Sequence, residues 1–397
     1  MQRLTSLTNS SLVPALRHPQ WRPLAVTVAA GLALALGGCC SINTAAPVDF
    51  APGASLSEDD VVAGELQRAL SAFLKPLTHG EWSDAHTDPD ERERYAFFYK
   101  SLLRGARDAE PIVLKSYPLE EGAYLITVAF VTGVPDALAF SRIVELEAVP
   151  TVSGFHFRCP YERHTAQLQR RTIGDVTYRF SGPFDEERAV EFARFKTELE
   201  ANRGLEAEPL QYDCFQSLDE LLRAYGLVHD ASKCNFLRHD LGFLEDDGRR
   251  FVTGTGDERY IFGYVRGALS ARATDSNDIY GPYVVGVASY YGGYGLSGES
   301  LEVLARQFRE ELERRPALDF LEEFEKGRGS SVQRHFSYFV MCAFLCQEIV
   351  ANHGEAAALR LVASGENGEQ FFDELEALIG VTRQNFHATI MRLIGSR

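Results

Sequence analysis

The chain has 397 residues, enough for two domains, and a formal net charge of −16 at pH 7. This acidic balance argues against a nucleic-acid partner, because phosphate binding needs clustered lysines and arginines. An acidic protein is also not attracted electrostatically to an anionic lipid surface, so membrane attachment would need another interaction.

The first 38 residues have the features of a secretory leader. They contain three arginines and no acidic residue, and an apolar run follows at 24–36. That run is too short for a bilayer-spanning helix, which takes about 20 apolar residues. It ends in Leu36-Gly37-Gly38-Cys39. This stretch resembles the lipobox of bacterial lipoprotein precursors. An ordinary signal peptide with an accidental cysteine, or an uncleaved N-terminal anchor, are the alternatives.

The resemblance implies cleavage between Gly38 and Cys39 and lipidation of Cys39. The thiol would take a diacylglyceryl group, and the freed amine a further acyl chain such as palmitate. Two or more chains, at ~0.8 kcal/mol per buried CH₂, hold a protein on a membrane. Cys40 follows in place of an aspartate, which in proteobacterial lipoproteins favours the outer membrane. We therefore expect a membrane-anchored protein of the bacterial cell envelope, facing the periplasm or the exterior.

The remaining cysteines do not form a small disulfide framework. Five lie beyond the lipobox: Cys159, Cys214, Cys234, Cys342 and Cys346. A Cys214–Cys234 disulfide is one possibility in this compartment. Cys342 and Cys346 share one face of an expected helix, where buried packing suits them.

The first region of the mature chain has an α+β pattern. A tether at 39–57, rich in Ala, Pro, Ser and Gly, leads into it. Apolar periodicity predicts helices at 59–78 and 91–105, then strands at 111–117, 123–131, 141–149 and 154–159. The order of elements over 58–165 resembles the nuclear-transport-factor-2-like fold, a helix packed over a curved antiparallel sheet.

The second region, 170–397, mixes strands and helices and then becomes helical. After a polar connector at 161–171, we expect a strand or hairpin at 172–180, a helix at 185–202, a strand at 209–215 and a helix at 218–225. Tyr260–Val265 is predicted as a strand. Helices are expected at 300–314, 317–326, 331–352, 355–363, 368–379 and 383–394. The apolar stretch 336–350 should be the central core helix.

No complete catalytic motif is present: the sequence has no HExxH, GxSxG, P-loop or Rossmann glycine pattern. We therefore expect no cofactor, no metal ligands and no catalytic residues. The outline of 172–397 nevertheless resembles the peptidase-MA-like, gluzincin-type domain of bacterial secreted proteins. In that family an HExxH or HDxFH helix precedes an E-G-x-A-x-Y-x-G-G element, whose glutamate is the third zinc ligand.

The resemblance fails at each metal ligand. The second element is visible at 285–293, but Val285 stands where the glutamate belongs. The first element is at best 277–281, where Asp278 and Tyr280 fit while Asn277 and Gly281 replace the two histidines. The resemblance thus implies a degenerate metallopeptidase-like domain.

Three functions follow as hypotheses. The leading one is a non-catalytic binding or scaffold protein with an unknown protein, peptide or glycan partner. The second is an active membrane-tethered hydrolase or peptidase using some of Asp278, His229, His239 and Glu299. The third is a small-ligand carrier whose first region holds a pocket lined by Trp82, Tyr95, Phe98, Tyr124 and Phe130.

A candidate groove accompanies the leading hypothesis. It would be lined by Asp278, Tyr280, Tyr283 and Tyr290, in a tyrosine-rich stretch that could bind a peptide or glycan. The same tyrosines could instead pack under the C-terminal helices.

Overall fold

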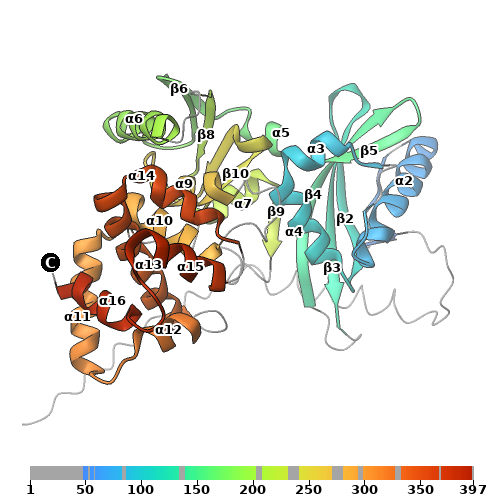
Figure 1. Ribbon diagram of the computed structural model, residues 1–397. Coiled ribbons are helices and arrows are strands. Elements are labelled where there is room, and N and C mark those ends of the chain that lie inside the picture. The colour runs from blue at the N-terminus through green and yellow to red at the C-terminus, as the bar shows by residue number, and fades with distance from the viewer. Residues whose placement is uncertain are drawn as a thin grey trace, which may run out of the picture.

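The protein has an α+β fold with two mixed sheets and a helical C-terminal half, as the sequence predicts (Figure 1). The structure is a computed structural model. It describes residues 48–51, 54–57, 59–82, 86–133, 139–202, 208–230, 241–270, 280–293, 298–326, 332–365 and 368–395. The leader, with Gly38 and Cys39, lies outside the described residues. Within them, no helix is both long enough and apolar enough for a bilayer crossing.

The first sheet has the order β1-β2-β3-β4-β5, and β9 also pairs with β4. Its strands are β1 (Asp49–Phe50), β2 (Glu110–Pro118), β3 (Tyr124–Thr132), β4 (Ala139–Thr151), β5 (Gly154–Arg158) and β9 (Leu227–Asp230). All pairs are antiparallel except β1 with β2. Because β1 lies inside the expected tether at 39–57, the tether is shorter than predicted.

Three helices pack with this sheet: α2 (Asp60–Thr78), α3 (Pro89–Arg94) and α4 (Ala96–Ala106). Asp59 caps α2, accepting hydrogen bonds from the backbone N–H groups of Val61 and Val62 at 2.8 and 3.2 Å. The single helix expected at 91–105 is wrong. The chain breaks it at Tyr95, which has non-helical angles of φ −120° and ψ 45°.

The second sheet has the order β10-β11-β8-β7-β6. Its strands are β6 (Gln169–Ile173), β7 (Val176–Phe180), β8 (Leu210–Cys214), β10 (Gly242–Glu245) and β11 (Arg250–Thr253). The three central strands are parallel, and a hairpin adds an antiparallel strand at each edge. The β10–β11 hairpin turns through the short helix η3 (Asp246–Gly248), and η2 (Glu120–Gly122) joins β2 to β3.

Three helices accompany this sheet: α5 (Tyr161–Thr165), α6 (Glu186–Asn202) and α7 (Leu218–Ala224). Ser217 caps α7, and its side chain accepts a hydrogen bond from the N–H of Glu220. The polar connector expected at 161–171 is wrong, because Tyr161 is fully buried and starts α5.

The C-terminal half contains α9 (Ile261–Ser270), α10 (Gly281–Gly292), α11 (Leu301–Arg314), α12 (Phe320–Lys326), α13 (Val332–His353), α14 (Glu355–Arg360), η5 (Leu361–Ala363), α15 (Gly368–Ile379) and α16 (Phe386–Gly395). Helix α13 lies at its centre (Figure 1), and its residues from Val340 to Cys346 are almost completely buried. The core helix is therefore confirmed.

The strand expected at Tyr260–Val265 is wrong, because helix α9 begins at Ile261 and includes residues 261–265. Phe262, Val265 and Leu269 are buried at spacings of three and four, which is helical periodicity. Six apolar residues alone cannot distinguish this period from that of a buried strand.

Candidate functional site at the junction of the two sheets

A buried pair of opposite charges lies on neighbouring parallel strands. Arg179 on β7 is directly opposite Asp213 on β8, and their side chains are 3% and 0% exposed. The guanidinium donates two hydrogen bonds to the carboxylate, at 2.8 and 2.7 Å. Tyr161 and Gln211 also donate to it, at 2.5 and 3.0 Å. The Asp213 carboxylate is therefore surrounded by donors.

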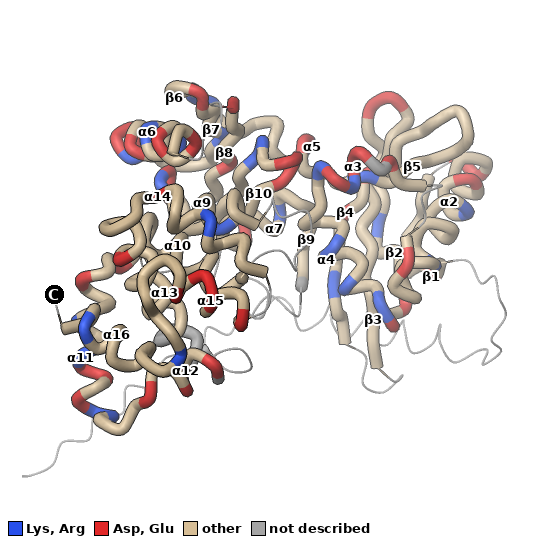
Figure 2. The backbone as a smooth tube through the Cα atoms, viewed as in Figure 1, with Lys and Arg blue, Asp and Glu red and all other residues tan. Residues whose placement is uncertain are grey.

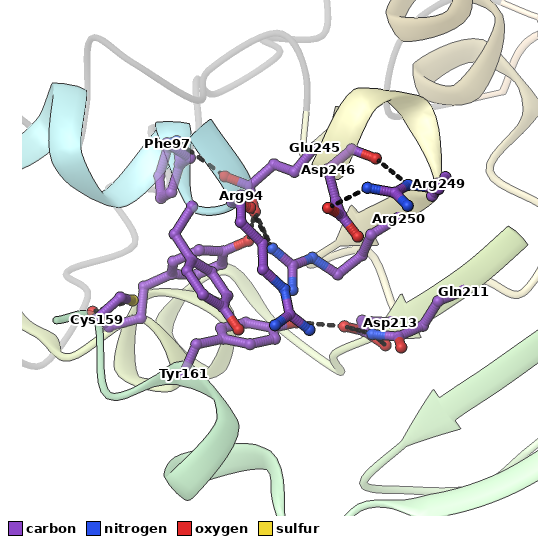
Figure 3. Close-up of polar contacts among 12 residues, drawn as sticks. Arg94, Phe97, Cys159, Tyr161, Gln211, Asp213, Glu245, Asp246, Arg249 and Arg250 are labelled. Atoms are coloured by element: carbon purple, nitrogen blue, oxygen red, sulfur yellow. Dashed lines mark hydrogen bonds and ion pairs between the residues drawn. The ribbon is translucent and has the colours of Figure 1, made fainter. Parts of the chain in front are cut away.

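A second buried pair connects this sheet to the first region. Glu245 and Arg250 face each other across the β10–β11 hairpin, 3.0 Å apart. The other Glu245 oxygen accepts the backbone N–H of Phe97, at the start of α4, at 2.8 Å. The Arg250 guanidinium lies 4.4 Å from the ring centre of Tyr95 and 5.0 Å from that of Tyr161. The hairpin thus has a hydrogen bond to α4, through Phe97, and a ring contact with Tyr161 of α5 (Figure 3).

Glu162 joins the two pairs at the rim. Its carboxylate accepts hydrogen bonds from Tyr95 at 2.8 Å and Arg179 at 3.0 Å, and lies 3.6 Å from Arg250. Partial burial opposes its ionisation, but the Tyr95 hydrogen bond and the Arg179 charge outweigh it and lower the pKa of Glu162. We call Glu162, Arg179, Asp213, Glu245 and Arg250 the charge network.

A hollow opens beside the charge network. It has a volume of 510 Å³, within the range of small-ligand sites. We call it the junction hollow, and it is lined by Trp82, Arg92, Glu93, Ala96, Tyr99, Lys100, Leu244, Glu245, Asp246, Asp247 and Gly248. It lies between α3 and α4 on one side and the β10–β11 turn on the other, so the charge network fixes the position of its walls.

Glu91 is a carboxyl group whose pKa lies near neutral pH. Burial raises the pKa of Glu91 to about 7, although Arg158 and Arg94 act in the opposite direction. It lies on α3, the helix that also carries two lining residues of the junction hollow. A carboxyl group with this pKa can exchange a proton at physiological pH.

Neither buried thiol of the sheet regions is a candidate nucleophile. Burial raises the pKa of Cys159 and Cys214 well above the ordinary value, which keeps both sulfurs protonated and weakly reactive. Cys214 is a free thiol. Its possible disulfide partner, Cys234, lies outside the described residues.

The structure separates the residues of the predicted groove. Tyr280 and Tyr283 are buried and pack on Phe371 of α15, with ring centres 4.3 and 5.6 Å away. Tyr290 instead lines a separate hollow with Tyr291. Asp278 and His239 lie outside the described residues. His229 is on β9 in the first sheet, whereas Glu299 precedes α11 and accepts a hydrogen bond from Gln307.

Most of the aromatic side chains expected to line the carrier pocket are packed in the core of the first sheet. Tyr95, Phe98 and Phe130 are at most 1% exposed and belong to the core of the first sheet. Tyr124 is partly buried against that core, and Trp82 lines the junction hollow. The described aromatics of this set therefore pack as core.

The segment 285–293 forms the C-terminal part of helix α10 and its C-cap Gly293. Within the described part of the chain, no three His, Cys, Asp or Glu side chains are grouped to hold a metal ion. No family model, curated protein or solved structure matches this chain.

Proposed function

We propose that this protein is a lipid-anchored protein of the bacterial cell envelope that binds a partner without catalysing a reaction. The observation that supports the absence of catalysis is that protein donors surround the buried Asp213 carboxylate. Asp213 accepts from Arg179, Tyr161 and Gln211, so its oxygens face partners within the protein. A general base needs an oxygen directed at the substrate, and the network instead fixes the two sheets to each other.

The junction hollow is the binding surface in this proposal. Its lining combines the aromatic ring of Trp82 with the cations Arg92 and Lys100 and the acids Asp246 and Asp247. Such a mixture suits a peptide or another polar partner that carries both charged and apolar groups. A partner seated there would contact α3, α4 and the β10–β11 turn together.

The anchor is tested by acyl labelling of the precursor in a bacterial host. We expect radiolabelled palmitate on the native chain and on a Cys40→Ser variant, and none on Cys39→Ser. Cys40 is the matched control, because it is the neighbouring cysteine in the same leader context. Equal labelling of both variants, or no label on the native chain, would contradict lipidation at Cys39.

The absence of catalysis is tested on the mature chain, residues 39–397 with Cys39→Ser, purified without chelating resin. We expect no cleavage of casein or peptide libraries. Cleavage that EDTA abolishes, together with near-stoichiometric zinc, would replace this proposal with an active peptidase. Cleavage without zinc would favour the hydrolase alternative, to be followed by substitution of Asp278, His229, His239, Glu299 and Glu91.

A further inference from the structure

A second hollow lies where α6 of the second sheet meets the C-terminal half, at the end of α10 and the start of α14. Its volume is 380 Å³. We call it the tyrosine hollow, and it is lined by Phe195, Glu198, Leu199, Asn202, Tyr290, Tyr291 and Glu355. It shares no lining residue with the junction hollow, so it is a separate site.

The ring of Tyr291 in the tyrosine hollow is steeply inclined to those of Tyr290 and Phe195. Tyr290 and Tyr291 have ring centres 4.9 Å apart and planes at 68°. Phe195 and Tyr291 are 5.6 Å apart at 59°. A sugar ring stacks on one flat aromatic face, whereas inclined faces enclose a corner that suits a compact cation.

The charge of the hollow has the sign that complements a cation. Its described lining contains Glu198 and Glu355 and neither lysine nor arginine. Arg194 forms an ion pair with Glu198 at 3.9 Å, but both side chains are more than 60% exposed, so this contact neutralises little of the Glu198 charge.

Glu355 is held in place within the hollow. Its carboxylate accepts a hydrogen bond from the amide of Asn202. The hydroxyl of Tyr291 lies beside it, and burial together with the Glu355 charge raises the pKa of Tyr291. The only donor shown for this carboxylate among the described residues is the neutral amide of Asn202, which orients the carboxylate without cancelling its charge.

We propose that the tyrosine hollow binds a small organic ammonium ion, with the aromatic corner receiving the alkylated nitrogen and Glu355 supplying the opposite charge. The site is independent of the partner-binding function proposed above. An alkylated ammonium fits because it is weakly hydrated, is attracted by aromatic faces and needs no hydrogen-bond acceptor of its own.

The test compares choline with 3,3-dimethylbutan-1-ol, its neutral carbon isostere, by titration calorimetry on residues 39–397 carrying Cys39→Ser. The two probes have the same shape, so a difference between them reports the charge. We expect choline to bind at least about tenfold more tightly, a factor that corresponds to ~1.4 kcal/mol. Glu355→Gln should weaken choline about tenfold.

Matched variants distinguish choline binding at this site from a general effect of negative surface charge. Glu302→Gln removes one negative charge from an exposed position on α11 and should leave choline affinity unchanged. Tyr290→Leu should weaken choline about fivefold through loss of one aromatic face, with an unchanged unfolding midpoint as the check on folding.

Four outcomes would overturn the proposal. Equal binding of both probes would mean a purely apolar hollow. An equal loss of choline affinity in Glu302→Gln and Glu355→Gln would mean that only the long-range negative charge of the protein attracts choline. Binding of N-acetylglucosamine but not choline would mean a sugar site. Absence of choline binding up to about 10 mM, beyond weak single-site affinities, would remove the ammonium site while leaving the lipid anchor and the junction hollow as separate questions.

Discussion

At the scale of single residues, the glycines of α10 have a packing role. A Cβ built on Gly286 would lie 2.2 Å from the Cβ of Cys342 on α13, and one on Gly292 would lie 2.3 Å from the N of Phe262 on α9. Figure 2 shows α10 as a helix without charged residues in the middle of the C-terminal half. Gly286 and Gly292 therefore let α9, α10 and α13 approach closely.

Gly286→Ala is expected to destabilise the protein by about 2 kcal/mol or more. The new methyl group meets side-chain and backbone atoms of Cys342 that cannot both move aside, and overpacking typically costs ~1–3 kcal/mol. The measurement is the free energy of unfolding from urea denaturation of both chains.

Gly64→Ala is the matched control for this prediction. It also lies inside a helix, α2, but a Cβ there meets no atom within 4 Å. Both substitutions gain the same helix propensity, up to ~1 kcal/mol, so Gly64→Ala should be neutral or stabilising. Similar effects at the two positions would show that α10 and α13 are not in close contact.

Glu91 predicts a pH dependence of stability. Its pKa is about 7 in the folded chain against ~4.3 in an unfolded chain, so the folded state binds the proton more tightly. The stability contributed by this proton is complete below the unfolded pKa and is lost as the pH rises through about 7. Glu91→Gln should remove that loss. The stability of the variant should therefore increase relative to that of the native chain as the pH rises from 5 to 8.

Unfolding midpoints across this pH range measure the effect. Glu93→Gln is the control, because Glu93 is an exposed carboxylate on the same helix. It removes the same charge, and its midpoints should run parallel to those of the native chain. If the Glu91→Gln midpoints also ran parallel to the native ones, Glu91 would not be the group that takes up the proton.

At the scale of elements, the sequence predicts those whose own periodicity decides their structure. Helix α2 and strands β2 to β5 lie within a few residues of their expected positions. The errors occur where tertiary contacts decide. At Tyr95 the helix breaks, and the ring is held between Glu162 and Arg250, residues remote in sequence. At 260–265 the apolar run was too short to show its period.

The charge network has only a faint sequence signal. Arg179 and Asp213 are charged residues between apolar neighbours inside expected strands, which marks them as buried and paired. Their mutual pairing depends on the parallel register of β7 and β8, and that register cannot be read from local periodicity. Glu245 and Arg250 flank a short turn, where charged residues usually face solvent.

Glu245→Gln is expected to destabilise the protein by about 3–5 kcal/mol, because it leaves the 2%-exposed Arg250 guanidinium without its buried counter-charge. In a double-mutant cycle, Arg250→Met added to Glu245→Gln should cost much less than the two single changes together. The measurement is the unfolding free energy of the four chains.

A surface pair supplies the comparison. Arg259 and Glu191 are 2.6 Å apart but 44% and 39% exposed, so Glu191→Gln should cost at most ~1 kcal/mol. A cost for Glu245→Gln no larger than this would mean that the hairpin is not held by its buried pair.

At the scale of the whole molecule, the first core draws on residues from both regions of the sequence. Six large side chains between 215 and 252 are buried in the core of the first sheet: Phe215, Leu221, Leu222, Tyr225, Leu227 and Val252. In addition, β9 extends the first sheet along β4. The expected division into 58–165 and 170–397 stays a prediction, and the two regions share a core across it.

This shared core predicts that residues 48–165 do not fold cooperatively when expressed alone. Without the segment that carries α7 and β9, Phe97 loses its ring contact with Tyr225 and β4 loses its pairing with β9. Several kcal/mol of apolar burial would be lost at ~25 cal/mol per Å², which is a large part of a typical domain's stability.

We expect the isolated fragment to show a broad urea transition, whereas residues 48–397 unfold in a single sharp one. Leu221→Ala in the longer chain should lower that one transition by about 2–5 kcal/mol. A sharp transition of the fragment, or two separate transitions of the longer chain, would instead make 58–165 an autonomous domain and reduce the charge network to a contact between two independently folded parts.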